Sequence, residues 1–159
     1  MRVFGKTHRI PRLQAWYGER AYTYSHTVMP PQIFAPIVRE IQEVVTDITK
    51  LTVDAALLNL YRTGDDSMGW HADNEAELDG ERAIVSLSLG ASRRFLLRPS
   101  KKHPSMDALP TEKLELLLAN GDIVVMHPPM QEYTQHSLPK MKKVQEGRIN
   151  ITFRTMKIS

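Results

Sequence analysis

Apolar positions follow two different periods along this chain. Between residues 33 and 50 they recur every three or four residues, which predicts one amphipathic helix. After residue 50 the period changes to two, and this alternation predicts strands at 55–61, 83–90, 93–98, 113–118, 122–127, 133–138 and 148–154. Asn120-Gly121-Asp122 indicates a tight turn between two of them. We therefore expect a mostly β fold with a flanking helix, of the sandwich or barrel kind.

Length and composition favour a single domain over residues 1–159. The chain is 42% hydrophobic and carries no Gly/Ser linker or repeat, and its first 30 or so residues read as an irregular arm or short strands. With 0 Cys, disulfides, thiolate zinc sites, iron–sulfur clusters and cysteine nucleophiles are excluded. The sequence shows neither a secretory signal nor an apolar run of about 18 residues. We expect no membrane partner and a cytoplasmic protein of bacterial type, or a nuclear one in a eukaryote.

Charge is modest in sum but uneven along the chain. There are 21 Lys and Arg against 18 Asp and Glu, a net charge of +3. Basic groups gather in residues 1–24, 93–102 and 140–143, whereas acids gather in residues 65–81. Separate basic stripes suit a polyanion such as nucleic acid, although an ordinary solvated surface gives the same pattern.

A His-x-Asp motif is the first candidate for chemistry. His71 and Asp73 would point the same way at a strand end, so that both could bind one metal ion. The third ligand could come from the remaining histidines, which are His8, His26, His103, His127 and His136. His136 is the best choice because it lies in a predicted strand. Two histidines and one carboxylate form the triad of non-haem Fe(II) oxygenases.

The last predicted strand separates polar from apolar side chains. Strict alternation places four polar residues on one face, Arg148, Asn150, Thr152 and Arg154, and three apolar residues on the other, Ile149, Ile151 and Phe153. The polar face is either a solvated surface or a clamp for carboxylates. Together with an open metal site, a clamp would suit 2-oxoglutarate as co-substrate.

Several segments resemble those of a known protein family. They follow one another in the family's order and extend across nearly the whole chain. They are residues 4–6 (FGK), 11–18 (PRLQAWYG), 22–25 (YTYS), 58–61 (LNLY), 70–75 (WHADNE), 86–91 (SLSLGA), 136–139 (HSLP) and 148–154 (RINITFR). In these segments the chain resembles the AlkB-type Fe(II)/2-oxoglutarate-dependent dioxygenases. The resemblance implies a double-stranded β-helix, or jelly roll, over residues 51–159, with residues 1–30 as a nucleotide-recognition lid.

The resemblance also implies roles for individual residues. His71, Asp73 and His136 would bind Fe(II), with 2-oxoglutarate and O2 as co-substrates. 2-Oxoglutarate would be held by Asn59, Tyr61, Arg148, Asn150, Thr152 and Arg154. We expect Arg154 near the metal-chelating end and Arg148 with Tyr61 at the distal carboxylate, and the reverse arrangement stays open.

Substrate contacts are expected in the lid and next to the metal motif. By resemblance these are Phe4, Gly5, Lys6, Tyr24, His26, Asn74 and Glu75. Tyr24 and His26 would stack on the flipped base, although relatives often carry a larger aromatic residue at the position of His26. Glu75 would accept a hydrogen bond from an exocyclic amine. Lys6, Arg12 and the basic cluster 93–102 are expected on phosphates, and Trp16 and Tyr17 are expected to pack the arm.

The function implied is oxidative demethylation of 1-methyladenine and 3-methylcytosine in DNA, with release of formaldehyde, succinate and CO2. Single-stranded DNA is favoured over double-stranded DNA, and a monomer is expected. Two alternatives remain. An RNA demethylase would use the same mechanism, and a catalytically silent nucleic-acid-binding module would have no need of the intact metal and co-substrate residues.

Overall fold

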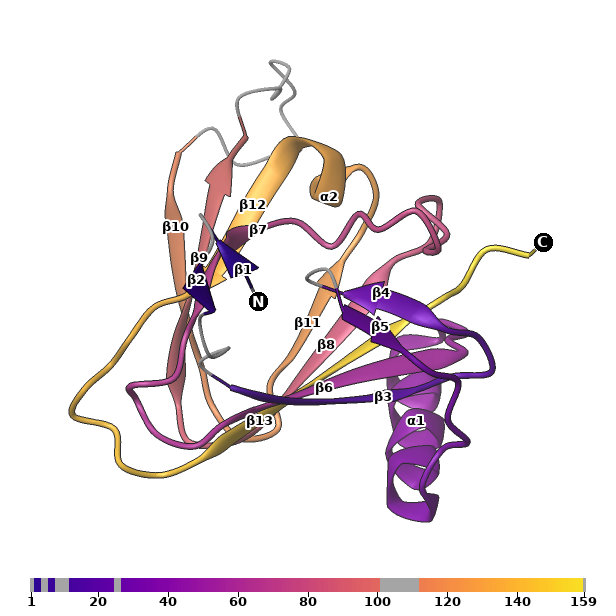
Figure 1. Cartoon of the computed structure of the whole chain (residues 1–159), viewed down its shortest axis with the longest axis horizontal. Helices are drawn as coiled ribbons and strands as arrows, with labels where there is room; N and C mark the ends of the chain where they lie inside the picture. The colour runs from indigo at the N-terminus through magenta and orange to yellow at the C-terminus, as the bar shows by residue number, and fades with distance from the viewer. Residues whose placement is uncertain (1, 4–5, 8–11, 25–26, 101–111, 159) are drawn as a thin grey trace.

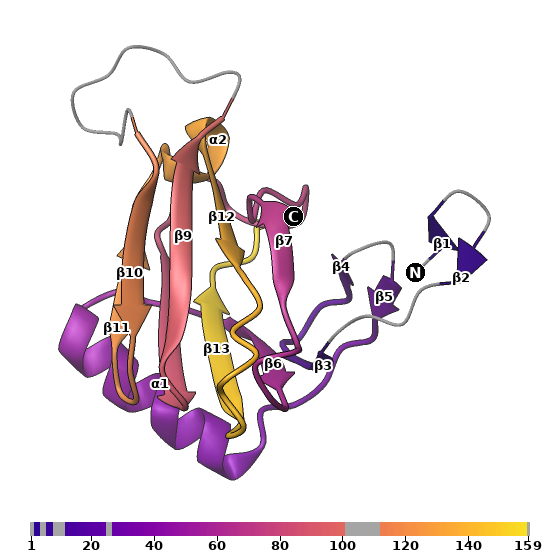
Figure 2. The ribbon, with the colours of Figure 1, turned by 90° about the vertical axis from the view of Figure 1, so that its left-hand side faces the viewer.

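Two antiparallel sheets build the protein, whose computed structural model describes residues 2–3, 6–7, 12–24, 27–100 and 112–158. The larger sheet contains, in spatial order, β11 (Ile123–Met126), β8 (Ile84–Gly90), β13 (Arg148–Arg154), β6 (Ala55–Tyr61) and β3 (Leu13–Tyr17). The smaller sheet contains β10 (Leu114–Leu118), β9 (Arg93–Pro99), β12 (Thr134–Leu138) and β7 (Met68–His71). In Figure 1 the two sheets face each other, and Figure 2 looks onto the smaller one.

A core of aromatic and aliphatic side chains fills the space between the sheets. It includes Trp16, Leu57, Ile84, Phe95 and Met126, all with at most 7% of their surface exposed. These residues come from both sheets, so burial of their apolar surface holds the sheets together. The polar pocket described below lies in the same space.

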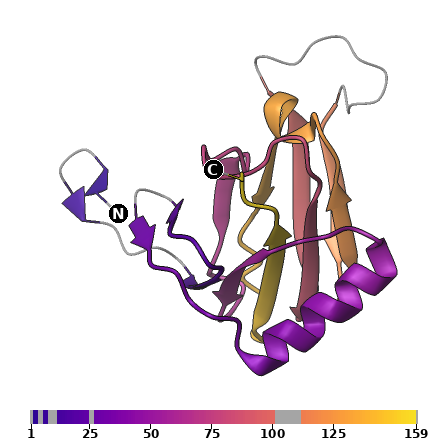
Figure 3. The same ribbon diagram turned by 90° about the vertical axis from the view of Figure 1, so that its right-hand side faces the viewer.

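The helix α1 (Pro36–Thr49) covers the outer face of the larger sheet (Figure 3). Val38 and Val45 pack there against Val85 and Phe153, and each buried side chain of this size contributes about 1.5–3 kcal/mol to stability. The helix begins later than the predicted residue 33 because Pro36 occupies its first turn, where no N–H is needed and the preceding residue stays extended. It ends before Lys50, which adopts a left-handed conformation at φ 60°.

The seven strands predicted from alternation are all present, within one residue at each end. The predicted turn at Asn120-Gly121-Asp122 is also confirmed, with Gly121 at φ +88°. Alternation missed β7, a short strand containing a glycine, and the single turn α2 (Met130–Tyr133). No helix in the described part of the chain has both the length and the apolar character needed to span a bilayer.

Both edges of β13 are paired, because the strand lies between β6 and β8 in the middle of the larger sheet. Ile151 and Phe153 pack against the helix layer, whereas Arg148 and Arg154 point into the sandwich and are 2% and 1% exposed. The polar face is therefore not a solvated surface. The alternative, a clamp for carboxylates, stays a prediction.

Of the two forms expected for the N-terminal segment, the short strands are confirmed. Its β3 pairs with β6 and extends the larger sheet, and Trp16 of β3 is buried. Two small hairpins, β1 (Arg2–Val3) with β2 (Lys6–Thr7) and β4 (Tyr22–Tyr24) with β5 (Thr27–Met29), lie to one side of the sandwich in Figures 2 and 3. The predicted packing role of Trp16 and Tyr17 is confirmed, since Trp16 stacks on Tyr22 and Tyr17 lies against Phe34. The division into a lid and a catalytic region stays a prediction.

Candidate active site

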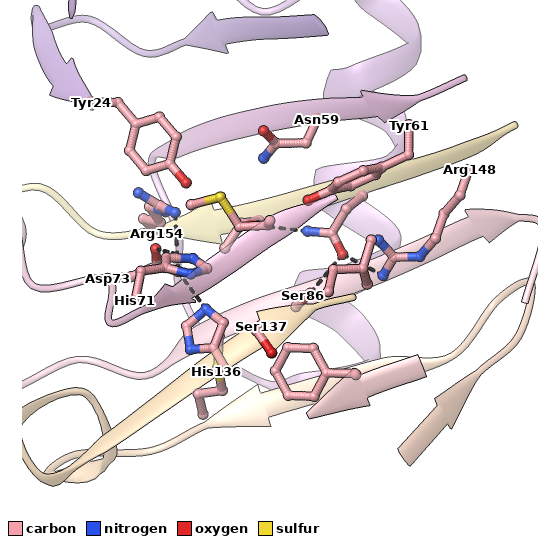
Figure 4. Close-up of a pocket in the computed structure, with 16 residues that line it drawn as sticks. Tyr24, Asn59, Tyr61, His71, Asp73, Ser86, His136, Ser137, Arg148 and Arg154 are labelled. Carbon is pink, nitrogen blue, oxygen red and sulfur yellow. Dashed lines mark hydrogen bonds and ion pairs between the residues drawn. The ribbon is translucent and has the colours of Figure 1, made fainter. Parts of the chain in front are cut away.

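Three side chains that could bind a metal meet where the end of β7 lies beside the middle of β12 (Figure 4). His71 is the last residue of β7 and lies opposite His136 of β12 in the strand register, and Asp73 follows two residues after β7. Nε2 of His71 is 3.7 Å from Oδ1 of Asp73, and Nε2 of His136 is 3.8 Å from Oδ2. All three ligand atoms lie within 4.8 Å of one another. The structure thus brings together the set predicted from His-x-Asp.

Each imidazole is oriented for ligation. Nδ1 of His71 lies 2.9 Å from the carbonyl oxygen of Gly69, so that an Nδ1–H donating there leaves Nε2 free to face Asp73. The ring of His136 stacks on Phe95, with centroids 5.3 Å apart. Burial lowers the pKa of His136 to about 4, although Asp73 opposes the shift. His136 is therefore neutral near pH 7, in the form that binds metals.

Asp73 is buried and ionised. Burial alone would raise its pKa, but Arg154 and the two histidines outweigh that effect and lower it. Nη2 of Arg154 lies 3.1 Å from Oδ2, and the backbone N–H of Asp73 donates to Oε1 of Gln131 at 2.9 Å. Oδ1 is buried and accepts no hydrogen bond from any described residue. An ionised, unpartnered oxygen facing an imidazole nitrogen fits a divalent cation, so the residues present suit Fe(II).

The inward face of β13 forms the opposite wall of the pocket. The side chains that line it here are Asn59, Tyr61, Ser86, Arg148, Asn150, Thr152 and Arg154. Nη2 of Arg148 donates to Oγ of Ser88 and to Oδ1 of Asn150, both at 2.7 Å. Nδ2 of Asn150 donates to Oγ1 of Thr152 at 2.8 Å. This row can bind an elongated anion lying along the strand.

Asn59 and Tyr61 of β6 occupy the same wall from the neighbouring strand. Oδ1 of Asn59 accepts hydrogen bonds from Nε of Arg12 at 2.9 Å and from Nε2 of Gln14 at 3.0 Å. Burial raises the pKa of Tyr61 above its ordinary value, so its hydroxyl keeps its proton. Both residues therefore offer fixed polar groups to the pocket.

Aromatic residues of β4 close the pocket above the metal cluster. Tyr24 lines it, and Tyr22 stacks on Trp16 with ring centroids 4.3 Å apart. The hydroxyl of Tyr22 accepts a hydrogen bond from Nη1 of Arg154. Glu75 lies 3.9 Å from the same nitrogen, and burial raises its pKa. Arg154 thus connects the β4 segment to the carboxylate of the metal cluster.

Comparison with known proteins decides the family. A family model described as the 2OG-Fe(II) oxygenase superfamily matches residues 3–154. The chain belongs to this superfamily. Fe(II), with 2-oxoglutarate and O2 as co-substrates, is therefore its cofactor set, and the cluster of His71, Asp73 and His136 fits it.

Relatives of this oxygenase support the AlkB-type resemblance. It is 36% identical over 156 residues to "DNA oxidative demethylase ALKBH2" of Mus musculus, covering 97% of this chain and 65% of the relative. It is 39% identical over 154 residues to "Alpha-ketoglutarate-dependent dioxygenase alkB homolog 3" of Homo sapiens, covering 94% and 53%. The chain thus spans roughly half to two thirds of these relatives' lengths.

The jelly-roll prediction is confirmed by a solved structure described as "The structure of OsALKBH1". It superposes on the oxygenase with a TM-score of 0.62 at 18% identity, over 89% of this chain and 77% of the other. At this identity the match concerns the fold alone.

The predicted substrate residues of the oxygenase fall into three groups. Tyr24 lines the pocket, whereas Glu75 and the exposed Asn74 line a second cavity that shares Asp73 with it. Lys6 belongs to β2, but its side chain is not described. Phe4, Gly5 and His26 lie outside the described residues.

Two basic residues expected on phosphates face the interior instead. Arg12 is 6% exposed and bonded to Asn59, and Arg93 is 0% exposed. Neither can contact a phosphate on the surface. The sequence predicted both residues to be exposed, because charge alone does not reveal which face of a strand is covered.

Sequence reasoning also overlooked residues that complete the site. Ser86 and Ser88 of β8 bond to Asn150 and Arg148, and Gln131 holds the backbone of Asp73. The serines alternate along a predicted strand, and this parity could have identified them as sharing one face. Gln131 carries no comparable signal in the sequence.

Proposed function

We propose that this oxygenase removes methyl groups from 1-methyladenine and 3-methylcytosine in DNA. The observation that carries the proposal is one pocket lined both by the metal-ligating cluster and by the polar row of β13. The name "DNA oxidative demethylase ALKBH2", carried by relatives at 36% identity, supports a DNA base as the substrate. The N-methyl group would be hydroxylated and released as formaldehyde, with succinate and CO2 formed from 2-oxoglutarate.

In this proposal His71, Asp73 and His136 would hold the metal. Bound Fe(II), with 2-oxoglutarate and O2, supplies the oxidising power that hydroxylates a methyl C–H bond. The residues of the chain would prepare the site for this chemistry. Arg154 keeps Asp73 ionised, and burial keeps His136 neutral. The buried rings of Tyr22 and Tyr24 would shield the cluster from bulk water.

Arg148 and Tyr61 would bind the distal carboxylate of 2-oxoglutarate, and Arg154 would lie near its chelating end. Arg148 has two neutral oxygen partners and no carboxylate partner among the described residues. Asn59, Asn150 and Thr152 would complete the binding row. Asn59 is held by hydrogen bonds from Arg12 and Gln14, and Asn150 donates to Thr152. A prearranged row of this kind binds without a large loss of side-chain freedom.

A second cavity supports a cationic base as substrate. It has a volume of about 510 Å³, and five acids line it, Asp73, Glu75, Asp79, Glu81 and Glu132, against two basic residues, Arg82 and Lys157. Methylation at N1 of adenine or N3 of cytosine gives the base a positive charge, which this lining would attract. Tyr24 would stack on the base and Glu75 would accept from its exocyclic amine.

Mass spectrometry of a single-stranded DNA oligonucleotide carrying one 1-methyladenine tests the proposal. We expect loss of one CH2 unit that depends on Fe(II), 2-oxoglutarate and O2. Single-stranded DNA should react faster than a duplex, because a base in a duplex must first be unpaired.

The same experiment with matched RNA and with a succinate assay separates the alternatives. Faster repair of the RNA would replace DNA by RNA as the substrate. Succinate formation without repair of either would keep the oxygenase and contradict these two lesions as substrates. Absence of succinate would indicate a silent binding module. A monomer acting in the cytoplasm stays a prediction, which light scattering and cell fractionation would check.

A further inference from the structure

Arg93 is a buried cation that the site described above does not use. It begins β9 and has 0% of its surface exposed. Its guanidinium donates to three backbone carbonyl oxygens: Nη1 to Thr63 at 3.0 Å, and Nη2 to Asp66 at 2.7 Å and Pro139 at 2.9 Å. These carbonyls belong to the segments between β6 and β7 and after β12. Through these hydrogen bonds, Arg93 connects the two sheets at one end of the sandwich.

Hydrogen bonding satisfies much of this guanidinium but does not neutralise its charge. Carbonyl oxygens carry no net charge, and Arg93 forms no ion pair with a described residue. The side chain of Asp66, whose backbone it touches, is already bound by Arg62 through two contacts of 2.7 and 2.8 Å. Nε of Arg93 is buried and has no partner among the described residues. Burial accordingly lowers the pKa of Arg93.

Tyr61 connects this charge to the pocket. Cζ of Arg93 lies 5.7 Å from the centroid of the Tyr61 ring, and Cζ of Arg148 lies at the same distance from it. Tyr61 and Arg148 line the pocket, whereas Arg93 does not. Arg93 can therefore act on a bound ligand only through the Tyr61 ring and through its electric field.

The two guanidiniums leave this end of the pocket strongly positive. Burial, together with the charge of Arg93, lowers the pKa of Arg148 to about 10, although Tyr61 opposes the shift. Burying a charge without a counter-ion costs free energy. An anion that binds beside these two guanidiniums would therefore be stabilised by their uncompensated charge.

We propose that Arg93 is a positioning residue for the co-substrate, which holds Tyr61 in place and supplies the second positive charge that favours a dicarboxylate over a monocarboxylate. This inference rests on the 2-oxoglutarate site proposed above. It differs from a purely structural role, in which Arg93 only fastens the two sheets. A structural role would alter the binding of all ligands of the pocket alike.

Binding of two 2-oxo acids of equal chain length distinguishes the two roles. 2-Oxoglutarate carries a distal carboxylate, and 2-oxopentanoate carries a methyl group there. Calorimetry would be carried out without O2 on Fe(II)-loaded protein, with no nucleic acid present. The variants are Arg93→Met, which removes the charge, and Arg93→Lys, which keeps it. Arg94→Met is the matched control, since Arg94 is exposed and paired with Glu115 at 2.6 Å.

We expect Arg93→Met to weaken 2-oxoglutarate binding about tenfold and 2-oxopentanoate binding by less than about twofold. Arg93→Lys should keep the selectivity within about threefold of wild type although it loses carbonyl contacts, and Arg94→Met should change neither affinity.

Equal losses for both acids in Arg93→Met, or no loss, would overturn the proposal. If Arg93→Met does not fold, Arg93→Lys decides: retained selectivity supports the role, and lost selectivity overturns it. A wild-type protein that prefers neither acid would overturn the 2-oxoglutarate site itself, and the role of Arg93 with it.

Discussion

Arg148 and Arg154 stand at opposite ends of β13, on the same face and almost fully buried, yet their surroundings differ. Arg154 lies 3.1 Å from the carboxylate of Asp73 and 3.9 Å from that of Glu75. Although burial by itself lowers the pKa of Arg154, these acids and Tyr22 raise it above the ordinary value. Arg148 has only neutral oxygens for partners, and its pKa falls to about 10.

This difference distinguishes a structural cation from a binding cation. The charge of Arg154 is compensated within the protein, so the folded state depends on it. The charge of Arg148 has no carboxylate partner among the described residues, so we expect ligand binding to depend on it. In this proposal the same residue type, six positions apart on one strand, serves stability at one end and recognition at the other.

Removing the carboxylate of Asp73 should have the largest effect. Asp73→Ala deletes a proposed metal ligand and also leaves Arg154 without its main partner, so turnover should fall by at least about 1000-fold. Formaldehyde release measures it. The control is His127→Ala, an exposed histidine away from the cluster, which should retain full activity. Residual turnover above a few per cent in Asp73→Ala would contradict the ligand set.

Substituting Arg154 should destabilise the protein without ligand. Arg154→Met leaves the buried Asp73 and Glu75 unpaired, so the free energy of unfolding should fall by about 3–5 kcal/mol. Urea titration of the metal-free protein measures it. A loss below about 1 kcal/mol would show that Arg154 is not a structural cation.

The corresponding change at Arg148 should affect binding instead. Arg148→Met removes an uncompensated buried charge, so the stability of the metal-free protein should stay within about 1 kcal/mol of wild type or rise. Affinity for 2-oxoglutarate should fall about 100-fold, as measured by calorimetry without O2. Similar losses of stability in Arg148→Met and Arg154→Met would contradict the assignment of Arg154 as structural and Arg148 as ligand-binding.

A smaller effect is expected from the residue that holds the backbone of Asp73. Gln131→Leu breaks the 2.9 Å hydrogen bond to the N–H of Asp73, so iron affinity should fall about tenfold while the fold is kept. Competition with a chromophoric chelator measures the affinity, and Gln145→Leu, at an exposed loop position, is the matched control. Unchanged iron affinity would contradict this role of Gln131 and would mean that Arg154 alone orients Asp73.

Features that depend on local spacing could be predicted from the sequence. Strict alternation identified the shared face of Arg148, Asn150, Thr152 and Arg154, and the spacing of His71 and Asp73 predicted a common metal site. Both follow from the period of two in a strand, which neighbouring residues fix between themselves. The same period of two located the seven strands, and a recurrence every three or four residues located the helix.

Partners distant in sequence were decided by the tertiary structure. Tyr22 bonds to Arg154 across 132 positions, a contact that no local pattern encodes. Arg93 and Arg94 are adjacent and read alike in sequence, but one is sealed in the interior and the other pairs with Glu115 on the surface. Alternation implies that they face opposite sides; only the packing of the two sheets determines which side is buried.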